Sequence, residues 1–177
     1  MKYQLKNVRL SFPSLFHKAK FEGAETKYEA TFLLDKEEHA DIIKQLQGGI
    51  AAKIKDDLKG AKLGPDKICL KDGDNIDYDG YEGKMSIKAS NGKRPLVINK
   101  DKSPLTEDDN VLYAGCYVNA FVELWAQNNG YGKRINANLL GVQFVKNGEP
   151  FGDGGAKVSI DDFDDIDDDD DGEDFPF

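Results

Sequence analysis

The sequence has little of what metal, disulfide and cofactor sites need. It holds two cysteines and two histidines among 177 residues. Cys69 and Cys116 lie far apart and show no C-x-x-C spacing, which favours reduced packing residues over a disulfide framework or a zinc site. Neither His17 nor His39 has a second ligand at metal spacing. We therefore expect no bound metal and no cofactor.

Long apolar runs and catalytic motifs are missing as well. The first ten residues, MKYQLKNVRL, have no apolar signal core, and no run of about 18 apolar residues follows, which favours an intracellular protein with no membrane role. There is no G-x-S-x-G elbow and no G-x-x-x-x-G-K-[ST] phosphate loop. A calcium loop beginning at Asp72 would need Glu where Gly83 stands. We expect no catalytic residues and no enzymatic activity.

What the sequence does have is a strongly acidic end. Residues 161–177 read DDFDDIDDDDDGEDFPF, with eleven carboxylates and no base. Such a segment cannot bury enough apolar surface to offset the entropy of ordering, so we expect it to be disordered in isolation. An apolar Phe-Pro-Phe terminus adds nothing to solubility, which indicates a peptide that binds a partner. A solvated tail without a partner is the alternative.

The charge divides the chain into two parts. The whole sequence has 24 Lys and Arg against 33 Asp and Glu, a net charge of −9. Removing the eleven acids of the tail leaves 22 acids against all 24 bases in residues 1–160, a net charge of about +2. We expect one domain over residues 1–151, followed by a flexible linker and acidic tail over residues 152–177.

Alternating polar and apolar residues predict strands near the start of the chain. In residues 3–15, Val8, Leu10 and Phe12 occupy one face of the alternation, and residues 27–34 repeat the pattern. Asp35 and Glu38 then have the spacing of a capping box, and apolar residues recur every four positions up to Leu58. This predicts a helical segment, bent or divided at Gly48 and Gly49.

Two hairpins are expected in the second half of the domain. Asn91-Gly92 is suited to a tight turn between strands at residues 84–89 and 93–98. Residues 113–127 and 133–146 form longer β-rich runs joined by the five residues NNGYG. In the first of these runs small and aliphatic residues alternate with aromatic and polar ones, so we expect the aromatic set to face outward.

Short strands, one helical segment and a mildly basic surface with outward aromatics favour a mainly β protein, a small OB-type barrel. Such a barrel binds single strands by stacking bases on aromatic rings, at about 1 to 3 kcal/mol per base, while Lys and Arg follow the phosphates. A core position is the alternative for each aromatic, least so for Tyr131, which stands between two glycines. The candidate stacking residues are Tyr113, Tyr117, Trp125 and Tyr131. The candidate phosphate-binding residues are Lys84, Lys88, Lys93, Arg94, Lys133 and Arg134.

The segments YAGCYVNAFVELW and NGYGKRINANLLGVQFVKNGEPFG, together with the acidic end, resemble the single-stranded DNA-binding proteins of tailed bacteriophages. The terminal residues Asp174, Phe175, Pro176 and Phe177 are also similar to the acidic tip of bacterial single-strand-binding proteins. The resemblance implies an OB-fold that coats single-stranded DNA during phage replication, recombination or repair, as a monomer or homodimer in the cytoplasm of the infected host. It also implies a tail that recruits phage or host replication proteins.

Our hypothesis from the sequence is a single-stranded DNA-binding domain whose tail recruits partners and competes with DNA for the groove. One alternative is an acidic DNA mimic or adaptor, whose tail occupies a basic cleft on another protein. Another is an RNA-binding or annealing protein, which shares nearly every sequence feature.

Overall fold

A computed structural model of the chain describes residues 2–151 and 163–166. The tail residues Asp174, Phe175, Pro176 and Phe177 lie outside the described residues, as does most of the segment that we expect to be a linker. Nine strands and one α-helix are found in the described part, together with three short 3-10 turns. In chain order they are β1 (Lys2–Ser14), β2 (Lys20–Phe21), β3 (Ala24–Glu25), β4 (Tyr28–Asp35), α1 (Ala40–Asp57), β5 (Leu70–Asp72), β6 (Lys84–Asn91), β7 (Leu96–Ile98), β8 (Tyr117–Asn129) and β9 (Gly132–Lys146).

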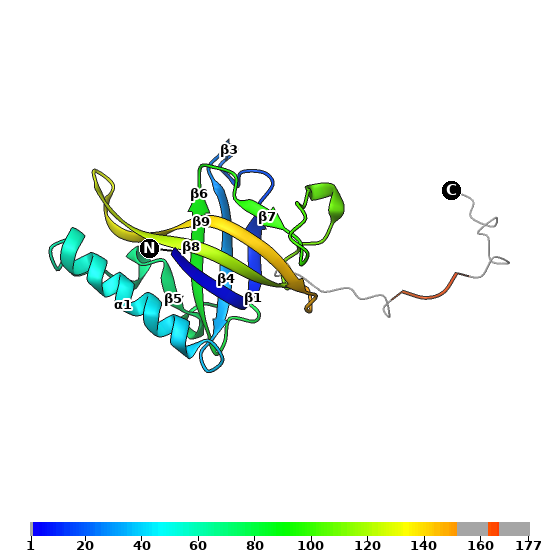
Figure 1. The fold of residues 1–177 in the computed structure, drawn as a ribbon, viewed down its shortest axis with the longest axis horizontal. Coiled ribbons are helices and arrows are strands. Elements are labelled where there is room, and N and C mark those ends of the chain that lie inside the picture. The colour runs from blue at the N-terminus through cyan, green and yellow to red at the C-terminus, as the bar shows by residue number, and fades with distance from the viewer. Residues whose placement is uncertain (1, 152–162, 167–177) are drawn as a thin grey trace, which may run out of the picture.

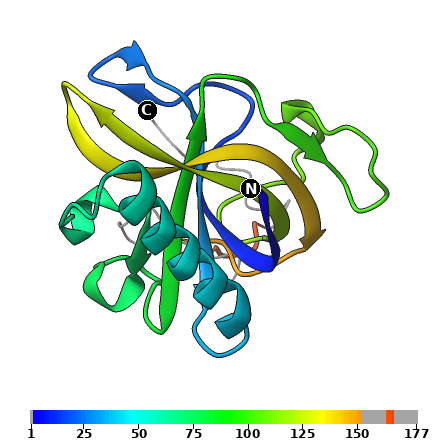
Figure 2. The same cartoon turned by 60° about the vertical axis from the view of Figure 1, so that its left-hand side comes forward.

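Five long strands close into a barrel (Figures 1 and 2). The order is β6-β4-β1-β8-β9, all antiparallel, and a parallel contact between Ser90 of β6 and Asn138 of β9 completes the ring. The short strand β5 extends the sheet beside β6, and β7 pairs in parallel with β9. The expected mainly β, OB-type barrel with one helix is confirmed.

The barrel interior follows directly from the alternation in the sequence. In β8, the small and aliphatic side chains from Val118 to Leu124 are buried at every second position, and the aromatic and polar set faces outward as expected. Phe32 of β4 and Leu139 of β9 are fully buried in the same core. Because successive side chains of a strand point to opposite faces, one apolar set per strand is enough to fill this barrel.

Helix α1 packs against the barrel through Ile43, Leu46 and Ile50, but it begins later than the capping box predicts. The Asp35 carboxylate accepts hydrogen bonds from the backbone N–H groups of residues 37 and 38, so it closes the turn after β4 instead of capping the helix. The helix runs without interruption through its two glycines. A Cβ atom at Gly49 would lie 2.2 Å from the Tyr3 hydroxyl oxygen, so glycine allows β1 to approach the helix closely.

The expected hairpin around Asn91-Gly92 is wrong. Strand β6 pairs with β4 and β5, whereas β7 pairs with β9, so the chain crosses to another part of the sheet between them. The Asn91 side chain directs this crossing, because its amide nitrogen donates to the Leu139 carbonyl at 3.1 Å while its oxygen accepts from the Lys93 N–H. The strand pairing that closes the barrel therefore outweighs the local preference of Asn91-Gly92 for a hairpin turn.

The long hairpin is confirmed, with a tighter turn than expected. Strands β8 and β9 pair from Tyr117 to Lys146 and are joined by Gly130 and Tyr131 alone, because the three other residues of the NNGYG connection are part of the strands. Tyr131 projects from this turn with 89% of its surface exposed. Among residues 2–151 and 163–166, no helix combines the length and the apolar character needed to cross a membrane.

Candidate nucleic-acid interface

A groove crosses the outer surface of the barrel over β4, β5 and β6. It consists of two adjoining hollows of about 430 and 220 Å³, which share Cys69, Lys71 and Lys88. Outward-facing residues of β4 and β6 form the floor, because the inward residues of both strands fill the core. We call the larger one the aromatic hollow, lined also by Phe12, Glu29, Thr31, Ile76, Tyr78, Tyr81 and Ser86. We call the smaller one the basic hollow, lined also by Asp66, Lys67, Ile68, Ser90, Arg134, Asn136 and Ala137.

Three aromatic rings follow one another along a wall of the aromatic hollow. The Phe12 and Tyr78 ring centroids are 5.1 Å apart and the Tyr78 and Tyr81 centroids 5.3 Å apart, both in edge-to-face geometry. Phe12 and Tyr78 are 56% and 58% exposed, whereas Tyr81 is 3% exposed. Aromatic rings this exposed contribute little to a core, so two of the three are free to offer a face to a flat ligand.

Phe12 faces outward, contrary to the alternation that places it with Val8 and Leu10. The pairing of β1 with β4 shifts between Ser11 and Ser14, and Phe12 at this bulge has a φ of 46°, in the left-handed region. For a bulky residue this conformation costs about 1 to 3 kcal/mol and persists only where the surroundings impose it. The bulge thus re-aims the side chain from the core to the groove.

Tyr81 is the buried support of this wall. Its hydroxyl forms a 2.8 Å hydrogen bond with the Ser11 hydroxyl, and burial raises the pKa of the Tyr81 phenol. A buried hydroxyl pair of this kind avoids the penalty of an unsatisfied polar group. Tyr81 therefore ties the segment that carries Tyr78 to strand β1, next to Phe12.

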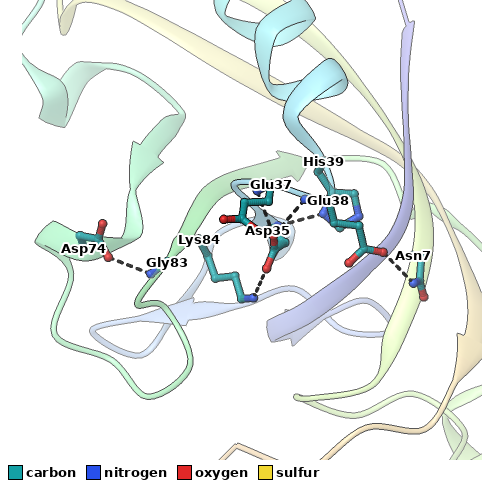
Figure 3. A network of polar contacts seen from close by, with 8 residues as sticks. All are labelled: Asn7, Asp35, Glu37, Glu38, His39, Asp74, Gly83 and Lys84. Atoms are coloured by element: carbon teal, nitrogen blue, oxygen red, sulfur yellow. Dashed lines mark hydrogen bonds and ion pairs between the residues drawn. The ribbon is translucent and has the colours of Figure 1, made fainter.

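Ion pairs hold the two ends of this aromatic segment. Lys36 lies 2.8 Å from the Asp72 carboxylate and 2.7 Å from that of Asp74, and Asp74 also accepts from the Gly83 N–H at 2.8 Å. Figure 3 shows this last contact beside the 2.7 Å pair of Lys84 with Asp35. The network fixes residues 72–84 to the end of β4, and thereby places Tyr78 and Tyr81.

These carboxylates make the groove segment sensitive to acid. The Lys84 hydrogen bond and two backbone N–H groups hold the pKa of Asp35 far below its usual range. Lys36 lowers the pKa of Asp72, and the Gly83 N–H followed by Lys36 lowers that of Asp74. Groups with lowered pKa values stabilise the fold above their unfolded pKa of about 3.9, and this contribution disappears as the pH falls through the folded values.

We expect the free energy of unfolding, measured by urea titration, to fall as the pH drops below about 4. Lys36→Met should weaken this dependence, because it removes a cation that lowers two of the pKa values. Lys44→Met, on the exposed face of α1, is the matched control and should leave the dependence unchanged. An identical pH dependence in Lys36→Met and the parent chain would contradict the assignment.

The basic hollow continues the groove toward β9. The two hollows together are lined by four cations and two acids, so the lining carries a net charge of +2. The cations are Lys67, Lys71, Lys88 and Arg134, and the acids are Glu29 and Asp66. The Arg134 guanidinium donates to the Asp66 carbonyl at 2.9 Å, which fixes its position at the groove wall. Cations next to exposed rings are what a ligand with both charged and aromatic parts requires.

Cys69 lies where the two hollows meet. Burial raises the pKa of its thiol to about 11, so the side chain is neutral at physiological pH and is not a reactive thiolate. Both cysteines are free, as expected. In the described part of the chain, no three His, Cys, Asp or Glu side chains gather where they could hold a metal ion.

The structure places the predicted phosphate-binding residues in different settings. Lys88 and Arg134 line the groove, and Lys133 is exposed near the β8–β9 turn, which also carries the predicted stacking residue Tyr131. Lys84 is held by Asp35. Lys93 is exposed, and the Arg94 guanidinium lies 5.6 Å from the centroid of the Phe16 ring.

The other predicted stacking residues are not among those that line the groove. The Tyr113 hydroxyl donates to the Gly148 carbonyl at 2.8 Å and accepts from the Gly148 N–H, which fastens the chain after β9. The Tyr117 ring lies 4.9 Å from the Lys146 ammonium. Trp125 is half-buried on β8, opposite Asn136 of β9. The structure does not bring these three together with Tyr131.

Sequence reasoning missed Phe12, Tyr78, Lys67 and Lys71. The strand alternation placed Phe12 on the same face as Val8 and Leu10. The one sign that the regular strand ends there was the proline that follows. Tyr78 stands in an Asp- and Gly-rich stretch, a composition typical of a turn or loop. The two lysines had no aromatic neighbour in the sequence that would distinguish them from ordinary surface residues.

The chain leaves the barrel close to the aromatic hollow. Phe151 is the last described residue before the gap, and its ring would lie 2.4 Å from a Cβ atom at Gly80, whose φ is +83°. The Arg9 guanidinium covers the same ring at 3.9 Å and donates to the Gly115 carbonyl. Because Gly80 follows Tyr78 by two residues, Phe151 lies beside this end of the groove.

Comparisons with known proteins point in one direction. The model of the family described as "Enterobacter phage Enc34, ssDNA-binding protein" matches residues 1–175. The solved structure of the single-stranded DNA-binding protein from bacteriophage Enc34 is 37% identical, with a TM-score of 0.77 over 88% of this chain and 87% of that one. The structure of that protein in complex with ssDNA is 38% identical, with a TM-score of 0.77 over 85% of this chain and 89% of that one. A putative protein p50 of Acyrthosiphon pisum secondary endosymbiont phage 1 is 42% identical over 92% of both chains.

Proposed function

The chain belongs to the family of the Enterobacter phage Enc34 ssDNA-binding protein, and on that premise we propose that it binds single-stranded DNA along the groove. Bases stack on Phe12 and Tyr78, while phosphates contact the cations of the basic hollow. Tyr131 and Lys133 extend the contact beyond the basic hollow at the β8–β9 turn. No step of this binding requires catalysis, a cofactor or a metal ion.

The proposal rests on one observation: exposed rings and unburied cations line the same groove. The groove is continuous because its two hollows share three lining residues. A single strand offers unstacked base faces and regularly spaced phosphates, and so uses both halves. A duplex hides its base faces and would use the basic half alone. The solved structure of the Enc34 protein with ssDNA adds support from within the family.

Parallel titrations of ssDNA, RNA and duplex DNA of equal length test the proposal. We expect the tightest binding to ssDNA, with a salt dependence of log affinity of about −0.7 per neutralised phosphate. Preference for RNA would favour the RNA-binding alternative. Absence of binding to all three, with or without the tail, would favour the DNA mimic or adaptor.

We also propose that the acidic tail competes with DNA for the groove and recruits replication proteins. The position of Phe151 next to Gly80 supports competition, since the chain that carries the acids is tethered to the barrel beside the aromatic hollow. The apolar residues Phe175, Pro176 and Phe177 suit a partner's pocket. In this proposal the protein coats single strands during replication, recombination or repair in the cytoplasm of the infected bacterium, as a monomer or homodimer.

Truncation after Gly155 should raise affinity for short ssDNA severalfold at low salt, because it removes the eleven acids. Fluorescence titration with labelled oligonucleotides measures the change. Deletion of only Phe175 to Phe177 is the matched control, which should keep the acids and the parent affinity while losing partner recruitment. Unchanged or weaker binding after the longer truncation would rule out competition.

A further inference from the structure

One ion pair of the groove joins a largely buried carboxylate to an exposed ammonium group. Glu29 of β4 lies 3.0 Å from the Lys88 ammonium on β6, and their side chains are 22% and 63% exposed. The register pairs Thr31 with Lys88, so Glu29 reaches the lysine diagonally across the two strands. Both residues line the aromatic hollow, and Lys88 also lines the basic one. A carboxylate therefore lies deep in a surface on which the cations must meet phosphate.

We propose that Glu29 competes with the DNA phosphate for Lys88 and thereby limits the affinity of the groove. This inference rests on the proposed function and assigns Glu29 a role within it. The Lys88 ammonium projects far enough to reach a phosphate, but the carboxylate 3.0 Å away already satisfies part of its charge. A phosphate that approaches Lys88 also approaches Glu29, and like charges at that distance repel.

Glu29 differs from Asp66, the second acid of the groove lining, in how far water screens its charge. Asp66, the other acid of the groove, meets Arg134 through its backbone carbonyl, and its carboxylate is 3.8 Å from Lys67. That carboxylate is 75% exposed, so water screens it. Glu29 is less exposed and faces the lysine that both hollows share. Its charge is the one least screened from a strand that spans both halves.

The competition has a consequence for how the protein leaves DNA. A protein that covers transient single strands must be displaced when the strand is copied or paired. When a phosphate leaves Lys88, the Glu29 carboxylate can pair with the lysine again, and this lowers the free energy needed for dissociation. Glu29 should therefore shorten the lifetime of the complex.

The test is a gain of binding, which a damaged fold does not produce. Glu29→Gln should raise ssDNA affinity about 3- to 10-fold at 0.05 M salt, slow dissociation in a competition experiment, and steepen the salt slope by up to about 0.7, one additional phosphate contact. Glu123→Gln on β8, outside the groove, makes the same charge change and should alter affinity less than 2-fold.

Lys88→Gln completes the cycle. If Glu29 acts mainly through Lys88, then Glu29→Gln gives a gain of less than 2-fold in the Lys88→Gln background. Weaker or unchanged binding of Glu29→Gln, a gain no larger than that of Glu123→Gln, or a full gain without Lys88 would each overturn the proposal while leaving ssDNA binding intact. If neither the parent chain nor any variant binds ssDNA, the proposed function fails and this inference fails with it.

Discussion

Replacing Phe12 and Tyr78 together by alanine should weaken ssDNA binding about 100-fold. Stacking contributes roughly 1 to 3 kcal/mol per base, and a loss of about 1.4 kcal/mol at each ring gives two powers of ten. Both rings are more than half exposed, so their removal leaves no cavity in the core. Fluorescence or calorimetric titration with an oligonucleotide measures the loss.

Phe121→Ala is the matched control for the aromatic pair. Phe121 is 42% exposed on the outer face of β8 and lines neither hollow, so we expect its removal to change affinity less than 2-fold. The single variants Phe12→Ala and Tyr78→Ala should not add exactly to the double, because the two rings touch. Equal losses in Phe121→Ala and in the pair would show that stacking occurs elsewhere.

Replacing Lys67, Lys71 and Arg134 by glutamine should reduce the salt slope of ssDNA binding by about 2, since each cation accounts for roughly 0.7. At 0.05 M salt the affinity should fall by about two to three powers of ten, and the curves of variant and parent should converge near 1 M, where counterion release no longer favours binding. These three residues line the basic hollow, and Lys88 is left in place for the competition with Glu29.

Glutamine at Lys2, Lys44 and Lys55 removes the same charge from elsewhere on the surface. Lys2 begins β1 and the other two lie on exposed positions of α1, outside the groove. We expect a small, uniform loss of affinity with the parent slope. A slope that falls equally in both triple variants would mean that the net charge of the chain, and not the groove, sets the salt dependence.

Local pattern was sufficient for much of the fold. The two β-rich runs predicted the long hairpin, and the alternation in β8 predicted the faces of that strand, because the two-residue period of a strand depends on nothing beyond it. It failed at Phe12, where a bulge inserts a residue and reverses the face. It failed again at Asn91-Gly92, where closure of the barrel outweighed a favourable turn.

The site was less accessible to such reasoning. Tyr131 stood out because a tyrosine between two glycines cannot reach a core from a tight turn, and it is the most exposed aromatic of the described chain. Lys88 and Arg134 were among the predicted phosphate-binding residues, and both line the groove. Tyr78 gave no signal, because its position depends on the hydrogen bond of Tyr81 to Ser11 and on ion pairs between residues nearly forty positions apart.

By itself, the sequence determined the class of the protein: a mainly β domain of slightly positive charge, followed by a strongly acidic end. Net charge is a count of residues, and the alternation of apolar side chains lies within one strand. Neither depends on which strands pair with one another. Tertiary structure alone decided the groove, since its lining comes from β1, β4, β5, β6, β9, residues 66–69 and the segment around Tyr78. Such a surface exists only after strands distant in sequence have paired, because the burial of the whole core, and not any local preference, chooses those pairs.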